Sequence, residues 1–454
     1  MSISRFLFAI FPGFSHLALA MPVAHRLREQ GHAVAFATND TLREIIESEG
    51  FEFFEAGSPG LSEERLYLEG GLDGLYGIDL NNEMWERLFI PLAETMTEDL
   101  LNIVPRFRPD ALFADATVYG MPVVAALTGV PWASYTPGLY MNDSCDLPPV
   151  GPGLPPPRSE RERQMYQQWK ASSTQSSHSS ALEKVEGWNW GLNRLRTKHG
   201  LELLDNPASD LSRSLTVSFV DESFDYPRSD LPPYVHFVGP SLWNWSNGGS
   251  LPEPLKKRSK TRPIIYVTLG TVFGGVRHAF DTCVEALKEI NAQIVVTTGR
   301  FGDPASNRQL PENFIVERFI PNNLILPMAD LVVCHAGFVT TMGALGQGVP
   351  LVCLPIAADN PEVAQRVQEA GAGLRLDNAR AGESIKTALT SEKLRAAVLT
   401  VLGNRTYLTN AHRLRDSFQQ HDGPSETARL LSELVATRKP VLRQRDYWTR
   451  GSAQ

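Results

Sequence analysis

The sequence predicts an α/β protein of two domains, each built on a parallel, doubly wound sheet. Three observations support this prediction. At 454 residues the chain is too long for one ordinary hydrophobic core and suits two domains of about 200 residues each. Short apolar runs alternate with helical patterns in both halves, as expected where each strand is followed by a helix. A polar, Gly- and Pro-containing segment, 241–262, separates the halves and is the predicted linker.

The first half, residues 1–240, forms the predicted N-terminal domain. Its predicted strands lie near Phe6–Phe11, Ala33–Thr38, Ala111–Ala114 and Trp132–Tyr135. Its predicted helices include Leu19–Arg28, Met84–Ile103 and Tyr119–Leu127.

An insertion rich in proline and serine follows the last of these strands. Residues 148–157 (PPVGPGLPPP) cannot continue a helix or a sheet. A helix is predicted at Glu160–Lys170, and the Ser-rich run 171–180 is expected to be mobile. The insertion is either a substrate lid or a variable surface loop.

The second half, residues 263–422, forms the predicted C-terminal domain, with a cleaner alternation. Its predicted strands are Ile264–Leu269, Gln293–Thr298, Phe314–Glu317, Leu331–Cys334 and Leu351–Leu354. In such sheets ligands bind at the carboxyl ends of the strands. A last helix, 423–437, is expected to pack back on the N-terminal domain, and the basic tail 438–454 is expected to be loose.

Composition excludes several classes of function. Lys and Arg total 43 against 51 for Asp and Glu, a net charge of −8 with no basic stripe, so we expect no nucleic-acid partner. The four cysteines show no CxxC spacing, and we expect reduced thiols in a cytoplasmic protein without a metal site. No apolar run reaches the roughly 18 residues that a transmembrane segment needs.

The N-terminus loosely imitates a signal peptide, with Arg5, an apolar run and the triplet Ala-Leu-Ala at 18–20. Pro12 and Gly13 interrupt the apolar run, and the pattern continues as a helix and a strand across the supposed cleavage point. Because cleavage would destroy this unit, we interpret the segment as part of the first domain.

The most informative segment begins at His335. A buried-looking strand ends one residue earlier, and a small-residue turn and the pair Thr340–Thr341 follow, where a helix begins. Free N–H groups and the dipole at a helix N-terminus favour a phosphate-like anion. Asp359 and Asn360 follow the next strand, at the same edge of the sheet. The pattern therefore indicates a site for a nucleotide-sugar.

Three separate motifs, at the correct spacing, resemble those of bacterial members of glycosyltransferase family 1. They are the stretch FAIFPGFSHLALAMPVAHRLREQGHAV at 8–34, the stretch VTLGT at 267–271, and a signature block made of 319–322, 335–345 and 359–360. The resemblance covers essentially the whole chain. It implies the GT-B fold, in which two Rossmann-like domains face each other across a cleft, and a nucleotide-sugar-dependent reaction without metal or other cofactor.

The resemblance implies that His16 is the general base and that Asp115, at the end of a strand, orients its imidazole. An imidazole that titrates near neutrality suits the removal of a proton from an acceptor hydroxyl. The reaction would be inverting O-glycosylation, with a hexose moving from a UDP- or TDP-sugar to a hydrophobic small molecule such as a macrolide, polyketide, flavonoid or terpenoid. Taken alone, the two residues are also compatible with a loop histidine and a helix cap.

The resemblance also implies a donor site in the C-terminal domain. His335, Thr340 and Thr341, with Thr271, would hold the diphosphate, while Phe319 would stack on the base and the Ile320 backbone would hydrogen-bond it. The other matching nucleotide positions are Asn322, Gly337, Val339 and Gly343, and the residues expected to bind sugar hydroxyls are Asp359 and Asn360. A core role for Phe319 and an N-cap role for Thr340 are the structural alternatives.

Acceptor identity would lie in the loops at 61–81 and 140–190. Their aromatic residues suggest an apolar acceptor, although aromatic residues also pack ordinary cores. These residues are Tyr67, Tyr76, Tyr140, Trp169 and Trp188.

Five positions depart from the family pattern. Asn322 and Asn360 replace glutamines, Ala336 and Val339 replace glycines, and Gly343 stands where a Glu normally binds both ribose hydroxyls. Loss of that charged acceptor would cost about 1.5–3 kcal/mol of binding. The choice between UDP and TDP is therefore open, since a thymidine nucleotide lacks one of those hydroxyls. A catalytically weak or inactive homologue that binds a nucleotide or activates a partner enzyme is the alternative function.

Overall fold

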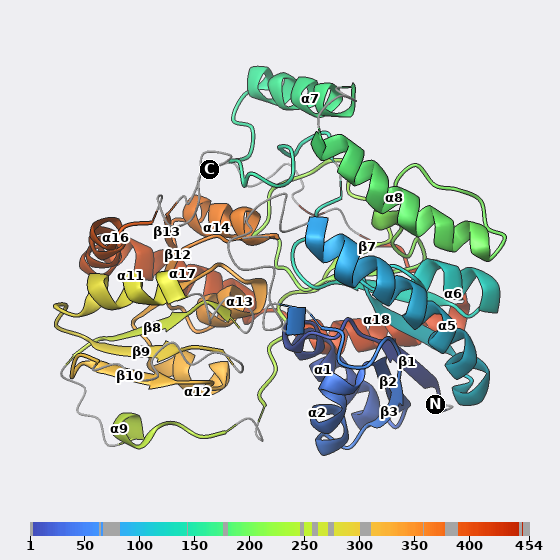
Figure 1. The fold of residues 1–454 in the computed structure, drawn as a ribbon, viewed down its shortest axis with the longest axis horizontal. Coiled ribbons are helices and arrows are strands. Elements are labelled where there is room, and N and C mark those ends of the chain that lie inside the picture. The colour runs from blue at the N-terminus through green and yellow to red at the C-terminus, as the bar shows by residue number, and fades with distance from the viewer. Residues whose placement is uncertain are drawn as a thin grey trace.

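The chain folds into two lobes, each built on one parallel sheet (Figure 1). The structure is a computed structural model that describes residues 3–62, 65–66, 82–142, 144–175, 180–245, 249–256, 262–270, 277–299, 310–356, 358–376, 389–444 and 447. Two parallel α/β domains were predicted, and this fold class is confirmed.

Within these residues the N-terminal lobe holds a seven-stranded sheet of order β3-β2-β1-β4-β5-β6-β7. The strands are β1 (Arg5–Ala9), β2 (Ala33–Thr38), β3 (Glu52–Glu55), β4 (Ala111–Asp115), β5 (Trp132–Thr136), β6 (Thr216–Ser218) and β7 (Val235–Phe237). The central strands are buried on both faces, which is why they are continuous apolar runs in the sequence.

The described part of the C-terminal lobe holds a six-stranded sheet of order β10-β9-β8-β11-β12-β13. The strands are β8 (Ile264–Thr268), β9 (Gln293–Thr297), β10 (Phe314–Glu317), β11 (Leu331–Cys334), β12 (Leu351–Cys353) and β13 (Gly373–Arg375). The predicted strands of both lobes are all present. The strands that the sequence did not reveal are short and contain polar residues or glycine: β3, β6, β7 and β13.

Helices connect the strands of both lobes. In the N-terminal lobe they are α1 (Phe14–Glu29), α2 (Arg43–Ser48), α5 (Ile90–Phe107), α6 (Met121–Thr128), α7 (Glu160–Gln175) and α8 (Ser180–Lys198). In the remainder of the chain they are α9 (Glu253–Lys256), α11 (Arg277–Leu287), α12 (Asn322–Ile325), α13 (Phe338–Gly346), α14 (Asn360–Glu369), α16 (Ser391–Gly403), α17 (Arg405–Phe418) and α18 (Gly423–Thr437). None of the helices in the described ranges is long and apolar enough to cross a membrane.

Three expectations about helices need correction. Helix α1 begins five residues earlier than predicted, because Gly13 caps it in an extended conformation and the apolar stripe extends back to residue 17. The expected helix at 84–103 opens with a π-helical turn, Trp85–Phe89, before α5. The first five residues of the Ser-rich run, 171–175, continue α7, and residues 176–179 lie outside the described part.

The C-terminal segment crosses back to the N-terminal lobe. Helix α18 contacts α1, and α1 also contacts α13 of the C-terminal lobe, so the lobes meet at these helices (Figure 1). Beyond α18 the backbone N–H of Val441 donates to the carbonyl of Ser214 at 2.8 Å, and that of Arg443 donates to Pro233 at 2.8 Å. The expectation of a loose tail is therefore wrong for residues 441–443.

Candidate active site between the lobes

Each sheet places its candidate residues where the strand order reverses. In the N-terminal lobe this point lies between β1, which leads to His16, and β4, which ends at Asp115. In the C-terminal lobe it lies between β8 and β11, which lead to Gly270 and His335. Such switch points leave a crevice at the carboxyl ends of the strands, where ligands of doubly wound sheets bind.

His16 and Asp115 form a hydrogen-bonded pair. Nδ1 of His16 lies 2.5 Å from Oδ2 of Asp115, whose side chain is fully buried, while the imidazole is 15% exposed and lines the cavity described below. Because a carboxylate accepts, the Nδ1 proton points to Asp115 and Nε2 of the neutral ring keeps its lone pair. His16 lies in the first turn of α1, not in a loop as one alternative had it.

Asp115 is held by further donors. Its Oδ1 accepts from the backbone N–H of Thr117 at 2.8 Å and from the Thr117 hydroxyl at 2.7 Å. Its Oδ2 also accepts from the Tyr135 hydroxyl at 3.2 Å. The following helix, α6, begins only after Gly120, so Asp115 is not its N-cap.

His335 lies between two glycines that leave room for its ring. A Cβ on Gly270 would lie 2.6 Å from Cε1 of His335, and a Cβ on Gly337 would lie 2.3 Å from Nε2. The imidazole is buried, and this burial lowers its pKa to about 4, although a hydrogen bond to the Thr268 backbone acts in the opposite direction. His335 is therefore neutral near pH 7 and available as a neutral donor.

The turn after His335 and the start of α13 line the same cavity. Gly337 is the N-cap of α13 and makes no side-chain cap hydrogen bond, which leaves the first N–H groups of the helix without a side-chain cap. Gly337, Val339, Thr340 and Gly343 all line the cavity. Thr341 does not.

The placement of Thr341 corrects one expectation. Its side chain is fully buried, because it faces the core side of α13 while Thr340 faces the cavity. Thr271 lies outside the described residues.

Asp359 and Asn360 stand at the start of α14, on the far side of the cleft from His16. Burial raises the pKa of Asp359 to about 6, with partial opposition from a backbone hydrogen bond and from His16. Its carboxylate reaches the N-terminal lobe, since a Cβ on Gly138 would lie 2.3 Å from its Oδ2. The Asn360 side chain is buried, and its Oδ1 accepts from the backbone N–H of Ile356 at 3.4 Å.

The predicted base-binding residues lie beside an aromatic cluster that the sequence did not reveal. Phe319 is half-buried, 5.8 Å from the rings of both Phe14 and Trp245, and Trp243 stacks on Trp245 at 5.4 Å. These two tryptophans belong to the segment that was interpreted as a polar linker. The spacing Trp-x-Trp was the only feature of the sequence that could have indicated the cluster. The cluster and the predicted positions Ile320 and Asn322 also line the cavity.

One cavity of about 850 Å³ joins the His16 pair, the α13 N-terminus and the sugar-binding candidates. Its N-terminal half is aromatic, with Trp188 stacked on Trp85 at 5.0 Å and Tyr119 beside them. Of the aromatic residues that were expected to contact an acceptor and that the structure describes, only Trp188 is placed here. Tyr140 belongs to a different hydrophobic cluster, Trp169 is 46% exposed and does not line the cavity, and Tyr67 and Tyr76 lie outside the described residues.

Two Rossmann-like lobes that face each other across a cavity define a protein of the GT-B class. Solved structures agree on this fold. The glycosyltransferase of kitacinnamycin superposes with a TM-score of 0.71 at 20% identity, covering 95% of this chain and 98% of that one. CalG4, the calicheamicin glycosyltransferase, gives a TM-score of 0.69 at 20% identity, covering 96% and 99%.

Sequence comparison places the chain in a family. Residues 281–434 match the C-terminal domain described as erythromycin biosynthesis protein CIII-like. The 4'-demethylrebeccamycin synthase of Lentzea aerocolonigenes is 31% identical over 447 residues, covering 95% of this chain and all of the relative. The aclacinomycin-T 2-deoxy-L-fucose transferase of Streptomyces galilaeus is 26% identical, covering 99% of each. The chain belongs to the natural-product glycosyltransferases.

Proposed function

We propose that this glycosyltransferase is an inverting O-glycosyltransferase of family 1. It moves a hexose from a UDP- or TDP-sugar to a hydroxyl of a hydrophobic small molecule. The observation that carries the proposal is the His16–Asp115 pair, at 2.5 Å, opening into the same cavity as the N-terminus of α13.

In the proposed reaction His16 takes the proton of the acceptor hydroxyl at Nε2. The acceptor oxygen forms a bond to the anomeric carbon while the bond from that carbon to the diphosphate oxygen breaks. A single displacement from the opposite face inverts the anomeric centre. Asp115 stabilises the imidazolium that results, as in a Ser-His-Asp triad whose serine is replaced by the substrate.

The leaving diphosphate gains negative charge as its bond to the sugar breaks. Neutral His335, the Thr340 hydroxyl and the free N–H groups at the start of α13 are donors fixed at one end of the cavity. Donors that are fixed in advance act on the transition state, and we propose that they serve in place of a metal ion. Asp359 and Asn360 would accept hydrogen bonds from the sugar hydroxyls.

The aromatic half of the cavity supports an apolar acceptor. Trp85, Trp188 and Tyr119 present large rings in the cavity that His16 also lines, and such surfaces bind flat or hydrophobic molecules through burial and stacking.

Mass spectrometry tests the proposal directly. The protein is incubated with UDP- and TDP-sugars and a mixed panel of aglycones, and products heavier by one hexose are sought. We expect transfer by the wild type and loss of about 10²–10⁴-fold in rate for His16→Ala. His25→Ala, which changes a histidine paired with Glu49 outside the cavity, is the matched control.

Two results would contradict the proposal. Tight nucleotide binding without transfer from any donor would favour a non-catalytic role. Full activity of His16→Ala would remove the assignment of the base.

A further inference from the structure

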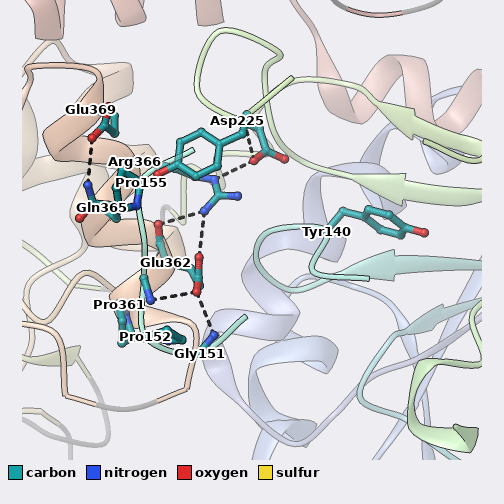
Figure 2. Close-up of polar contacts among 12 residues, drawn as sticks. Tyr140, Gly151, Pro152, Pro155, Asp225, Pro361, Glu362, Gln365, Arg366 and Glu369 are labelled. Atoms are coloured by element: carbon teal, nitrogen blue, oxygen red, sulfur yellow. Dashed lines mark hydrogen bonds and ion pairs between the residues drawn. The ribbon is translucent and has the colours of Figure 1, made fainter. Parts of the chain in front are cut away.

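The proline-rich loop that follows β5 is bound to the opposite lobe by one carboxylate. Oε1 of Glu362, on α14, accepts from the backbone N–H of Gly151 at 2.9 Å and from that of Gly153 at 3.0 Å (Figure 2). Both glycines have positive φ, 120° and 61°, which L side chains rarely adopt. Two N–H groups converging on one anionic oxygen form a strong, charge-assisted contact.

The loop also makes close contact through its backbone. A Cβ on Gly153 would lie 2.1 Å from the carbonyl oxygen of Pro361, so no larger residue fits without movement. Arg375, which follows on β13, donates to the carbonyl of Pro152 at 2.9 Å and also to that of Gly153. The loop is therefore seated on α14 by both its N–H and its C=O groups.

Behind Glu362 lies a buried network of four charges that crosses between the lobes. Oε2 of Glu362 accepts from Arg366 at 3.3 Å, and Nε of Arg366 donates to Asp225 at 2.7 Å (Figure 2). Asp225 also pairs with Arg228. The side chains of all four are no more than 5% exposed. Burial would raise the pKa of Asp225, but Arg366 and Arg228 hold it below its ordinary value.

The charges are divided evenly between the lobes. Glu362 and Arg366 belong to α14, whereas Asp225 and Arg228 belong to the β6–β7 connection of the N-terminal lobe. Each lobe thus brings one acid and one base, so the lobes can separate without leaving a charge unpaired. When the lobes are together, Arg366 also pairs with Asp225 across the interface. Removing the four charges from water costs free energy, which is offset only if the pairs have good geometry. This arrangement suits a contact that forms when the lobes close and opens again.

The same contact borders the reaction site. Val150 and Gly151 of the loop line the cavity beside Asp359 and Asn360 of the C-terminal lobe. Glu362 follows Asn360 by only two residues on α14. The position of the loop and that of the sugar-binding candidates are therefore set by one short piece of helix.

We propose that Glu362 is a positioning residue that holds residues 150–153 against the start of α14 and thereby fixes Asp359 and Asn360 relative to His16. The catalytic part of this proposal rests on the proposed function, whereas the contact itself does not. Hydrogen exchange and kinetics test the two parts separately.

Hydrogen exchange tests the contact between Glu362 and the loop without any substrate. Because proline has no N–H, residues 148–157 contain only four exchangeable amides, and two of them are the donors to Glu362. We expect peptides covering this segment to exchange about 10-fold faster in Glu362→Ala than in the wild type. Glu362→Gln keeps an acceptor oxygen, so its exchange rate should lie between those of the wild type and Glu362→Ala. Unchanged exchange in Glu362→Ala would overturn the contact.

Steady-state kinetics test the positioning role of Glu362. We expect Glu362→Ala to lower kcat about 10- to 100-fold, because small misplacements of reacting groups are costly. The Kd for the bare nucleoside diphosphate should stay unchanged, since the diphosphate contacts lie at α13. Gly153→Ala changes the N-terminal-lobe side of the same contact, and it should lower kcat in the same way. Gly129→Ala is its matched control, with a similar φ of 65° but no atom within 4 Å of the new Cβ.

The possible failures are distinguishable. Faster exchange with unchanged kcat and KM would overturn the positioning role and leave the contact. A wild type without transferase activity would overturn the proposed function and the positioning role together, while the exchange result would still decide the contact.

Discussion

Tyr135 donates a hydrogen bond of 3.2 Å to Oδ2 of Asp115, the same oxygen that lies 2.5 Å from Nδ1 of His16. The Tyr135 ring is buried in the sheet, and this burial, with the nearby Asp115 charge, raises the pKa of its hydroxyl well above the ordinary value. Tyr135 therefore stays a donor at any working pH. Because Thr117 donates to the other oxygen, both oxygens of the carboxylate are held by hydrogen bonds.

This arrangement predicts that Asp115→Asn lowers kcat by about 10²–10⁴-fold with little change in donor KM. An amide N–H facing Nδ1 would favour the other tautomer and protonate the nitrogen that has to act as the base. Tyr135→Phe is the control, since it removes one neutral donor and should cost less than about 10-fold in kcat. Steady-state kinetics check both variants, and a wild-type kcat for Asp115→Asn would exclude the assignment.

The raised pKa of Asp359 predicts a pH-dependent donor affinity. Its pKa of about 6 in the folded protein lies above the ordinary value of 3.8, so the carboxylate gains a proton as pH falls through about 6. A protonated acid accepts fewer hydrogen bonds from sugar hydroxyls, and the Kd for the nucleotide-sugar should rise below that pH. Calorimetric titrations over pH check this.

The same group has a defined effect on stability. The folded state binds the proton of Asp359 more tightly than the unfolded state does. Ionised Asp359 therefore lowers the free energy of unfolding above about pH 6, and this loss disappears as the pH falls from about 6 to 3.8. Asp359→Asn should remove both effects and bind the donor with less pH dependence. An unchanged pH profile in this variant would mean that another group is responsible.

A third prediction concerns the backbone at the diphosphate turn. Ala336 has a φ of 65°, a left-handed conformation that is costly for any residue with a Cβ. Ala336→Gly should therefore raise the free energy of unfolding by about 0.5–1 kcal/mol, measured by denaturant titration. Ala344→Gly, within helix α13, should lower it by about 1 kcal/mol. Equal destabilisation by both changes would show that the turn is not strained.

Much of the fold could be predicted from the sequence because its strands are buried on both faces. Leu331–Cys334 is a continuous apolar run between turns, and the structure has the strand at the predicted residues. The short strand Val235–Phe237 has a histidine at its centre and so lacks a continuous apolar run. Its place in the sheet comes from tertiary contacts that no local pattern records.

The position of a candidate residue at the cavity could be predicted where the residue follows a strand, but not where it belongs to a connection. His335 and Asp359 follow strands of one sheet, and parallel strands bring their carboxyl ends to a common edge. Trp243 and Trp245 reach the cavity from a segment whose composition indicated only a linker. Glu362 likewise gave no signal, because its partners Gly151 and Gly153 lie more than 200 residues away in the chain.

The absence of a carboxylate at Gly343 predicts which nucleotide the enzyme prefers. Gly343 lines the cavity on α13, and the family resemblance implies a Glu at this position that binds both ribose hydroxyls. A 2'-deoxyribose lacks one of those hydroxyls. Without the Glu, a TDP-sugar therefore loses fewer hydrogen bonds to its ribose, and less binding free energy, than a UDP-sugar does. We expect Gly343→Glu to strengthen binding of UDP-sugars relative to TDP-sugars by about 10-fold or more.

Space permits this change at a small cost. A Cβ on Gly343 would lie 2.8 Å from Cδ1 of Leu326, the flexible end of a side chain that can move aside. Gly346→Glu is the matched control on the same helix, because its Cβ would meet Cδ1 of Leu242 at 2.9 Å but the residue does not line the cavity. Competitive titration of both variants with UDP- and TDP-sugars measures the ratio. If Gly343→Glu leaves the ratio at the wild-type value, position 343 does not face the ribose, and nucleotide choice depends on residues around Phe319 instead.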